Sequence, residues 1–415
     1  MYKKSMRFNL NMLYEKDNKI MEKWYCIWLA IMPVLAHYGF AFMPYLGFAD
    51  YGLGFFYLIC VAKAIKTGKM PVDKCFLGLN VYFVVQLLIF ALYVTRQVDI
   101  ADAIGTSLRL LYTLFPLCLM PTCCETSNYH FKKAFRIVGI ITSLYGILQY
   151  IFGTYLHISL SPYIPFLPIL REGLDKQQEG WISYGWTVRA RSFFSEPSTF
   201  SIYLILALAL ELFEPDNTKN KNVIAIYIAG ILASRSSTGI LGLMFCFGLL
   251  ILEFVKKKHW VTGKRAMIGM LFLLPFLFFA LCKSGYVDSF INHTFASGQG
   301  LSGQSHFNGI SEAFKNDSSF LEIIFGHGLQ QVQGGGKDRY LPGWIRTYYC
   351  LGVVGTLLYA VSFFKIYCRT SSVGKKIILL FVFLNLGTEI MLGKFMLLYM
   401  SVAMTYSRNK VLNDA

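Results

Sequence analysis

The feature that most constrains this chain is a series of apolar blocks, each roughly 17–25 residues long, with short clusters of Lys and Arg between them. A block of this length crosses a lipid bilayer as a helix. Unpaired backbone amides in hydrocarbon cost several kcal/mol each, so the backbone there must be regular. The sequence therefore predicts an all-α, polytopic integral membrane protein with about 12 transmembrane helices, in a range of 10–12.

Composition agrees with this fold class and argues against several others. Hydrophobic residues make up 55% of the 415 positions and charged residues 15%, whereas a soluble domain carries about 25% charged residues. The net charge of +16 is spread over many short clusters, which argues against a nucleic-acid partner. Most of the ten cysteines lie inside apolar blocks, so neither a disulfide framework nor a metal site is expected.

The basic clusters predict the topology. The expected spans are 24–43, 45–65, 76–94, 101–121, 134–153, 197–213, 222–235, 238–255, 265–282, 344–366, 377–391 and 394–407, of which the last two are short enough to form one broken element. With the N-terminus inside, 26 of the 39 basic residues fall in inside segments. We therefore expect both termini to be cytoplasmic.

The domain organisation follows from the same spans. Residues 1–23 and 408–415 are expected to be cytoplasmic tails of a single transmembrane domain, 24–407, with large outer loops at about 154–196 and 283–343. A loop of 60 residues without internal structure is uncommon. Its apolar spacing predicts two short amphipathic helices on the outer face, the first with Phe307, Ile310 and Phe314 and the second with Phe320, Ile323 and Ile324.

The segment RARSFFSEPSTF at 189–200 is the most informative for function. Arg189 and Arg191 alternate, so an extended backbone would direct both to one side. Pro197 suits the first turn of a helix, Ser195 is an expected N-cap, and Glu196 would lie at the positive helix end. A well-capped helix with interfacial arginines accounts for the pattern equally well, so this alternative stays open.

Other charged residues lie within or beside apolar blocks. Arg109 falls near the middle of the fourth expected span, Arg235 lies in the turn SRSSTG, Arg346 begins the tenth span, and Glu389 and Lys394 bracket the final break. Ionisable residues at membrane depth usually face a polar cavity, although Arg235 and Arg346 could instead extend to the interface. Together they indicate an outward cavity rich in guanidinium groups, which suits a phosphate or diphosphate.

The second outer loop contains His293, His306 and His327, and they lack metal-ligand spacing. His327 lies in the glycine turn Phe325-Gly326-His327-Gly328. A histidine in such a turn can be a general base, but more often it is only a polar turn residue.

Four short motifs, in this order, resemble the bacterial Wzy-type polysaccharide polymerases. The stretch from Arg191 to Phe200 is similar to the FxEPS segment of that family, and Ser234–Gly239 is similar to its SR-S-T-G turn. Phe325–Gly328 resembles its GxG element, and Gly352-Val353-Val354-Gly355 resembles the GxxG entry into the next span. The likeness covers about residues 189–360, and the first 180 residues match only in hydropathy.

The resemblance implies a metal-independent glycosyltransferase of the bacterial inner membrane that needs no cofactor. Such an enzyme joins oligosaccharide repeat units carried on undecaprenyl diphosphate at the periplasmic face, for O-antigen or capsule-type polysaccharide, and a chain-length regulator is an expected partner besides membrane lipids. The related O-antigen ligases carry a His-Asn pair where this chain has Leu341-Pro342-Gly343-Trp344, which favours a polymerase. A ligase that transfers glycan to lipid A–core, a flippase of lipid-linked sugars and a non-catalytic scaffold remain alternatives.

We expect the following roles under the polymerase hypothesis. Arg191, Arg235 and Arg346 stabilise the departing diphosphate, with Arg189 and Arg339 as further diphosphate-binding candidates and Arg109 in the cavity. Glu196 is the expected base for the acceptor hydroxyl, or else it orients the arginines, and His327 is the second choice.

Overall fold

The fold was described from a computed structural model of the chain. It describes residues 20–40, 42, 46–68, 72–93, 100–123, 128–170, 183–184, 187–214, 219–256, 320–328 and 341–413. The predictions for Arg339, His293, His306, the span 265–282 and the helix at 307–314 concern residues outside these ranges.

The described chain is helical apart from one pair of two-residue strands. The helices are residues 20–35, α2 (Phe48–Thr67), α3 (Leu77–Tyr93), α4 (Ile100–Leu114), α5 (Pro116–Cys123), α6 (Asn128–Tyr155), α8 (Pro197–Phe213), α9 (Lys221–Ser234), α10 (Ser237–Lys256), α14 (Phe320–Phe325), α15 (Gly343–Arg369), α16 (Ser372–Leu384) and α17 (Lys394–Asn413). Strands β1 (Ser183–Tyr184) and β2 (Thr187–Val188) pair antiparallel, Ser183 opposite Val188.

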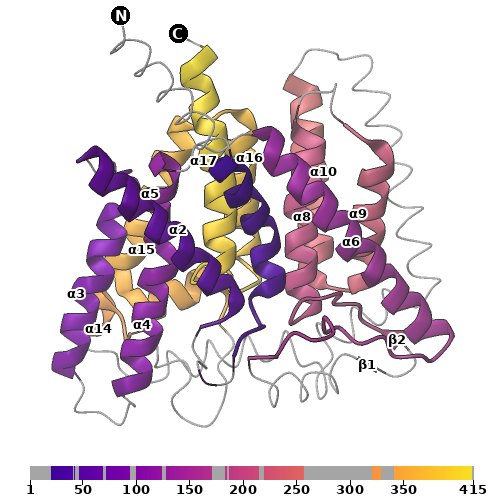
Figure 1. The fold of residues 1–415 in the computed structure, drawn as a ribbon, viewed down its shortest axis with the longest axis horizontal. Coiled ribbons are helices and arrows are strands. Elements are labelled where there is room, and N and C mark those ends of the chain that lie inside the picture. The colour runs from indigo at the N-terminus through magenta and orange to yellow at the C-terminus, as the bar shows by residue number, and fades with distance from the viewer. Residues whose placement is uncertain are drawn as a thin grey trace, which may run out of the picture.

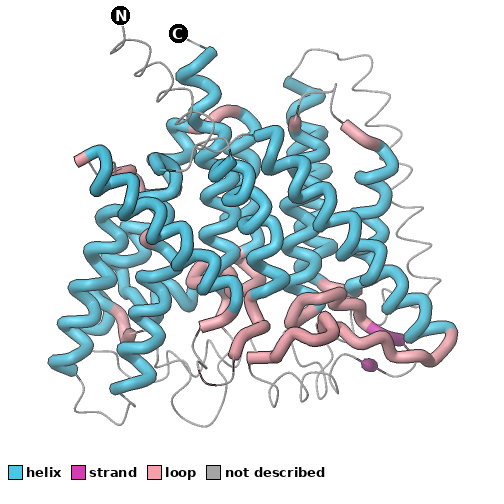
Figure 2. Tube along the Cα trace, in the orientation of Figure 1, coloured by secondary structure: helices cyan, strands magenta, loops and turns pink. Residues whose placement is uncertain are grey.

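The helices form three neighbouring groups (Figure 1). Helices α6, α8, α9 and α10 pack together at one side, and α2, α3, α4, α5, α14 and α15 lie at the other. Helices α16 and α17 stand between them, because α16 contacts α8 and α10 while α17 contacts α4 and α5. The strands and the longest described loops lie at one end of the helices, opposite the end of α17 (Figure 2).

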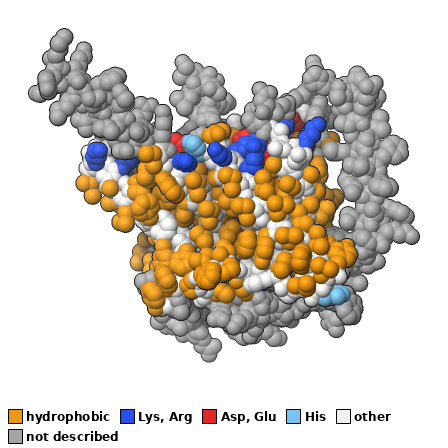
Figure 3. All heavy atoms as spheres, turned by 45° about the vertical axis from the view of Figure 1, so that its right-hand side comes forward, with side chains coloured by type: hydrophobic (Ala, Val, Ile, Leu, Met, Phe, Trp, Pro, Cys, Tyr) orange, Lys and Arg blue, Asp and Glu red, His pale blue; other side chains and the backbone are white. Residues whose placement is uncertain are grey.

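The surface and the helix lengths are those of a membrane protein. Helices α2, α6 and α15 are long and apolar enough to cross a bilayer, whereas α8, with 17 residues, extends only about 25 Å. Hydrophobic side chains cover a broad band of the face in Figure 3, and Lys and Arg gather along one edge of it. The finer expectation of twelve spans is not decided by these lengths.

The two ends of the bundle are named here for use below. The basic end is the edge where α17 ends and where Lys132 and Arg136 of α6 meet Glu211 and Glu214 of α8. The loop end is the opposite edge, which carries residues 156–170 and the segment 189–196 that precedes α8.

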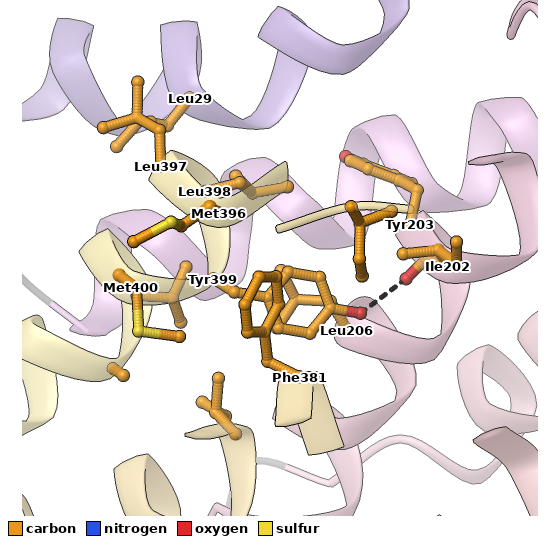
Figure 4. Packing of buried hydrophobic residues seen from close by; sticks show 14 of the residues in the cluster. Leu29, Ile202, Tyr203, Leu206, Phe381, Met396, Leu397, Leu398, Tyr399 and Met400 are labelled. Carbon is orange, nitrogen blue, oxygen red and sulfur yellow. Dashed lines mark hydrogen bonds between the residues drawn. The ribbon is translucent and has the colours of Figure 1, made fainter. Parts of the chain in front are cut away.

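Helix α8 is the centre of the packing. It is apolar on all sides, and 15 of its 17 residues are buried, as expected for a helix enclosed by other helices. Helix α17 packs against it through Tyr399, whose hydroxyl donates to the carbonyl of Ile202 at 2.8 Å (Figure 4). Phe381 of α16 lies beside the Tyr399 ring, with ring centroids 5.3 Å apart.

A buried ionic network fastens the basic end. Arg136 donates from Nε and Nη2 to the two carboxylate oxygens of Glu211 at 2.7 and 2.9 Å, and the Glu211 side chain is 2% exposed. Lys132 contacts Glu214 at 2.8 Å, and the hydroxyl of Tyr406 in α17 donates to the same carboxylate. Opposite charges at this depth are tolerated because each one has a partner.

Several expected boundaries agree with the structure and others are wrong. Helices α8 and α9 follow the expected spans 197–213 and 222–235. The first helix ends at residue 35 rather than 43, and the expected span 101–121 is two helices, because Pro116 starts a new one. The last two expected spans are separate helices, α16 and α17, joined by the non-helical residues 385–393.

The helix expected from Phe320, Ile323 and Ile324 exists as α14, which packs on α15 with none of its residues fully buried. Helix α15 is interrupted at Gly352, which has φ 65° and ψ −168°, a conformation open essentially to glycine alone. The backbone of residues 324–326 occupies the space a side chain would take there, since a Cβ on Gly352 would lie 2.5 Å from Gly326 N.

Helix α3 holds this contact from the other side. The hydroxyl of Tyr82 donates to the carbonyls of Phe325 and Leu351 at 2.9 and 2.6 Å. The amide of Gln86 donates to the carbonyls of Phe325 and Cys350 at 2.9 and 2.7 Å. Carbonyls released by the break in α15 are thus bonded within the protein, as a low-dielectric environment requires.

Candidate functional site

The segment 189–196 is fixed by α6 on one side and α9 on the other. The side-chain oxygen of Gln149 in α6 accepts the backbone amides of Arg191 and Ser192 at 3.3 and 2.7 Å. The backbone amide of Ala190 donates to the carbonyl of Ala233 in α9 at 3.1 Å. Ser192 has φ 52°, so the chain turns sharply after Arg191.

Arg191 is buried at the loop end, with only 3% of its surface exposed. Its Nη1 donates to the carbonyl of Ser195 at 2.8 Å and its Nη2 to the hydroxyl of Tyr163 at 3.2 Å. The guanidinium carbon lies 5.2 Å from the centre of the Tyr163 ring. These contacts hold the guanidinium in one orientation, as a preorganised anion site requires.

The N-cap residue of α8 differs by one position from the expectation, whereas the first helical residue agrees with it. Glu196, rather than Ser195, is the N-cap of α8, and Pro197 is the first helical residue as predicted. The hydroxyl of Ser198 donates to Glu196 Oε2 at 3.0 Å, and the Glu196 amide donates to the hydroxyl of Thr199 at 3.2 Å. Glu196 is therefore engaged in capping, and it remains partly exposed.

Arg235 ends α9 beside the same segment. It is the C-cap residue in the left-handed conformation, with φ 48°, and its amide donates to the carbonyl of Leu232 at 3.1 Å. The bond between Ala190 and Ala233 brings this helix end against the chain between Arg189 and Arg191. Two of the motifs named above, RARSFFSEPS and SRSSTG, thus meet in space.

The structure adds His37, which the motifs did not indicate. It lies in the loop after the first helix, and its carbonyl accepts the amide of Leu170 at 2.9 Å. Next to it, Tyr38 accepts the amide of Ile164 on its hydroxyl at 2.8 Å. The Nε2 atom of His37 is buried, and no group in the described part of the chain forms a hydrogen bond with it.

Two cationic side chains face His37. Burial, and after it the positive charges of Arg191 and Lys394, together lower the pKa of His37 to about 4. The imidazole is therefore neutral at pH 7. Contacts connect the same elements: Arg191 donates to Tyr163, and the next residue, Ile164, donates to Tyr38 in the first loop. The carbonyl of Tyr38 accepts the amide that begins α2, the helix whose Asp50 pairs with Lys394.

Lys394 continues the site toward α2 and α4. Its Nζ lies 2.9 Å from Oδ2 of Asp50 in the first turn of α2, and the Asp50 side chain is 1% exposed. Arg109 of α4 lies close enough for its charge to act on Lys394. We call His37, Asp50, Arg109, Arg191 and Lys394 the polar cluster; three of its members are cationic and one is a carboxylate.

Arg346 is held beside the polar cluster by an ion pair. It lies in the first turn of α15 and contacts Glu389 in the segment 385–393. The same segment leads directly into Lys394, so it connects the start of α15 with the start of α2. Both charges flagged at the final break in the sequence, Glu389 and Lys394, thus have partners on other helices.

His327 has a structural environment. Its ring stacks on Tyr349 of α15 at 4.2 Å with an interplanar angle of 6°, and its Nδ1 lies 3.2 Å from the Tyr349 carbonyl. Its amide donates to the same carbonyl at 2.9 Å. These contacts fasten the glycine turn to the broken helix, in agreement with a structural role for this histidine.

Within the described ranges, no group of three or more His, Cys, Asp or Glu residues is arranged to hold a metal ion. Comparison with known proteins gives the chain no relatives: no protein-family model matches it, and neither does any curated protein or solved structure.

Proposed function

We propose that this chain is a polymerase that joins undecaprenyl-diphosphate-linked oligosaccharide repeat units at the outer face of the bacterial cytoplasmic membrane. The observation that carries the proposal is the polar cluster, in which buried Arg191 and the Lys394–Asp50 pair meet around His37 at one end of the helices. Cationic groups fixed in a site of low exposure bind phosphate groups more strongly than they would in water.

The position of the cluster supports the outer face. Lys and Arg gather at the basic end, and a cytoplasmic basic end follows the usual charge bias of membrane proteins. The polar cluster lies toward the loop end, where Arg191, the start of α2 and the start of α17 meet. Under this orientation it meets substrates presented on the non-cytoplasmic side, as lipid-linked repeat units are.

The chemistry follows from the charges. A hydroxyl of the acceptor unit attacks the anomeric carbon of the donor, and the bond from that carbon to the diphosphate oxygen breaks. Negative charge grows on the departing diphosphate, and Arg191, with Arg235 from the adjoining helix end, stabilises it. Arg346 is already paired with Glu389, so we assign it to holding the segment 385–393 in place.

The test is polymerisation by purified protein in liposomes that contain undecaprenyl-diphosphate-linked repeat units. Wild type should produce a ladder of lengths without nucleotide or metal. R191A and R235A should each lower the polymerisation rate by about 10²–10³-fold. R191K keeps the charge but loses the planar guanidinium, so its rate should lie between those of wild type and R191A. R369A is the matched control, because the Arg369 side chain is 58% exposed and far along α15 from its first turn.

The outcomes separate the alternatives. Transfer of finished glycan to lipid A–core in one step would identify a ligase, and movement of units across the bilayer without a ladder would identify a flippase. Ladders of normal length and rate from both R191A and R235A would refute the assigned site.

A further inference from the structure

Within the proposed function, we infer that His37 is a catalytic residue: its Nε2 takes the proton of the acceptor hydroxyl, and it does so only when a diphosphate occupies the polar cluster. The inference rests on the proposed function for the identity of the reaction. Its coupling to diphosphate binding can be measured separately.

The first support is the state of the imidazole. Nε2 of His37 is buried and without a hydrogen-bond partner among the described residues, which is costly for a polar atom unless a ligand completes it. The backbone of His37 is fixed by the Leu170 amide, which donates to its carbonyl, and its ring lies 4.3 Å from that of Tyr38. A buried acceptor on a fixed loop is suited to a single incoming donor.

The second support is the arrangement of charges around it. Arg191 from the segment before α8 and Lys394 from α17 both act on His37, while Asp50 of α2 and Arg109 of α4 act on Lys394. Two cations beside an imidazole make it a poor base. Burial lowers the basicity of His37 most, and a diphosphate bound between Arg191 and Lys394 cancels the part that the two cations add, so it makes His37 a stronger base than in the free protein.

The other candidate bases fit less well. Glu196 is engaged with Ser198 and Thr199 at the start of α8, and His327 stacks on Tyr349 and bonds its carbonyl. His37 is the described histidine on which the charges of Arg191 and Lys394 act together.

The step balances as follows. The acceptor oxygen forms a bond to the anomeric carbon of the donor, whose bond to the diphosphate oxygen breaks with its electron pair going to that oxygen. The hydroxyl proton passes to Nε2 of His37. As undecaprenyl diphosphate leaves it takes that proton, the two cations again face His37, and the imidazole returns to its neutral state.

The first experiment measures proton uptake on binding of geranyl diphosphate, a short prenyl diphosphate, to the intact protein. Calorimetry at pH 5.5 in buffers of different ionisation enthalpy should show that wild type takes up a measurable fraction of a proton more than H37Q, because the bound diphosphate raises the pKa of His37 from about 4. The uptake measured with H37Q corrects for protons that the ligand itself takes up on binding. Equal uptake by wild type and H37Q would overturn the inference.

The second experiment measures polymerisation. H37Q should lower kcat by about 10²–10⁴-fold while the affinity for geranyl diphosphate at pH 7.5 stays within about threefold, as expected for a lost base rather than a lost binding group. H130Q, in the first turn of α6, is the control and should match wild type. An H37Q rate equal to that of wild type would overturn the inference.

The two readouts separate the inference from the function it rests on. If wild type forms no polymer but shows the extra proton uptake, the proposed reaction is wrong and the coupling between His37 and diphosphate stands. If H37Q does not fold, NMR of ¹³C-histidine in wild type decides: one of the seven histidines must become imidazolium when geranyl diphosphate is added at pH 5.5. No such change would overturn the inference.

Discussion

Replacing Gly352 by alanine tests whether α15 depends on its backbone contact with the segment around α14. The new Cβ would overlap the carbonyl oxygen of Ile324 and lie 2.5 Å from Gly326 N, and both neighbours are main-chain atoms that cannot rotate away. The residue would also have to keep φ 65° and ψ −168°. Alanine must therefore either accept both strains or separate the two segments.

The magnitude follows from these two terms. A non-glycine residue in this region of backbone conformation costs about 1–3 kcal/mol, and forcing a methyl group into a well-packed site costs about 1–3 kcal/mol more. We expect G352A to lower the free energy of unfolding by about 2–6 kcal/mol. The thermal unfolding midpoint of the purified protein in detergent should fall accordingly.

The matched control is Gly248 in α10, where an added Cβ would meet nothing within 4 Å. G248A should leave the midpoint unchanged or raise it slightly, because alanine is favoured over glycine within a helix by about 1 kcal/mol. A G352A protein with the midpoint of wild type would refute the reasoning, since it would mean that α15 can close its break without the contact.

Three further predictions concern buried charges. E211Q should destabilise the protein by about 1.5–3 kcal/mol, because Arg136 loses the carboxylate that accepts both of its hydrogen bonds while Lys132 keeps Glu214, whereas exposed Lys133→Gln should change the midpoint little. In a double-mutant cycle, D50N and K394M should each lower the free energy of unfolding more than the D50N/K394M double variant does, because either single change leaves one buried charge alone. Additive effects of the two substitutions would contradict the pairing. His37 binds a proton near pH 6.5 in the unfolded chain but only near pH 4 in the folded protein. The free energy of unfolding should therefore fall by about 3 kcal/mol as the pH drops from 6.5 to 4, and H37Q should lose less stability over that range.

Hydropathy predicted the helices that are surrounded by lipid or by the protein core. It could not distinguish the end of such a helix from an apolar loop that follows it. Residues 36–40 contain no Asp, Glu, Lys or Arg that would end the apolar block, yet the chain there bonds to another loop: Gly39 donates to the carbonyl of Pro168, and Leu170 donates to the carbonyl of His37. Window averages report transfer to an apolar environment, not which partner receives each backbone amide. For that reason the first span was expected to end eight residues later than it does.

The candidate site was predicted in part. Ionisable residues within apolar blocks usually face a polar cavity, and this rule identified Arg109, Glu389 and Lys394 from the sequence. The partners of Glu389 and Lys394 lie on distant helices, which no local spacing indicates. The same rule, applied to Asp50 and His37, would have found both. The pairing of Arg346 with Glu389 could not have been foreseen, because it depends on the path of the segment 385–393.

The contact of α3 with the broken helix also sets an order for biosynthesis. Tyr82 and Gln86 bind carbonyls that lie 239 to 269 residues later in the chain. At about 5–20 residues per second, α3 waits on the order of 10–50 s after its own translation before these acceptors exist. During that interval the Gln86 amide and the Tyr82 hydroxyl need water or an insertase groove in place of these carbonyls. A chain that terminates before α14 and α15 should therefore leave α3 without these partners, and we expect proteases to clear such a membrane fragment readily.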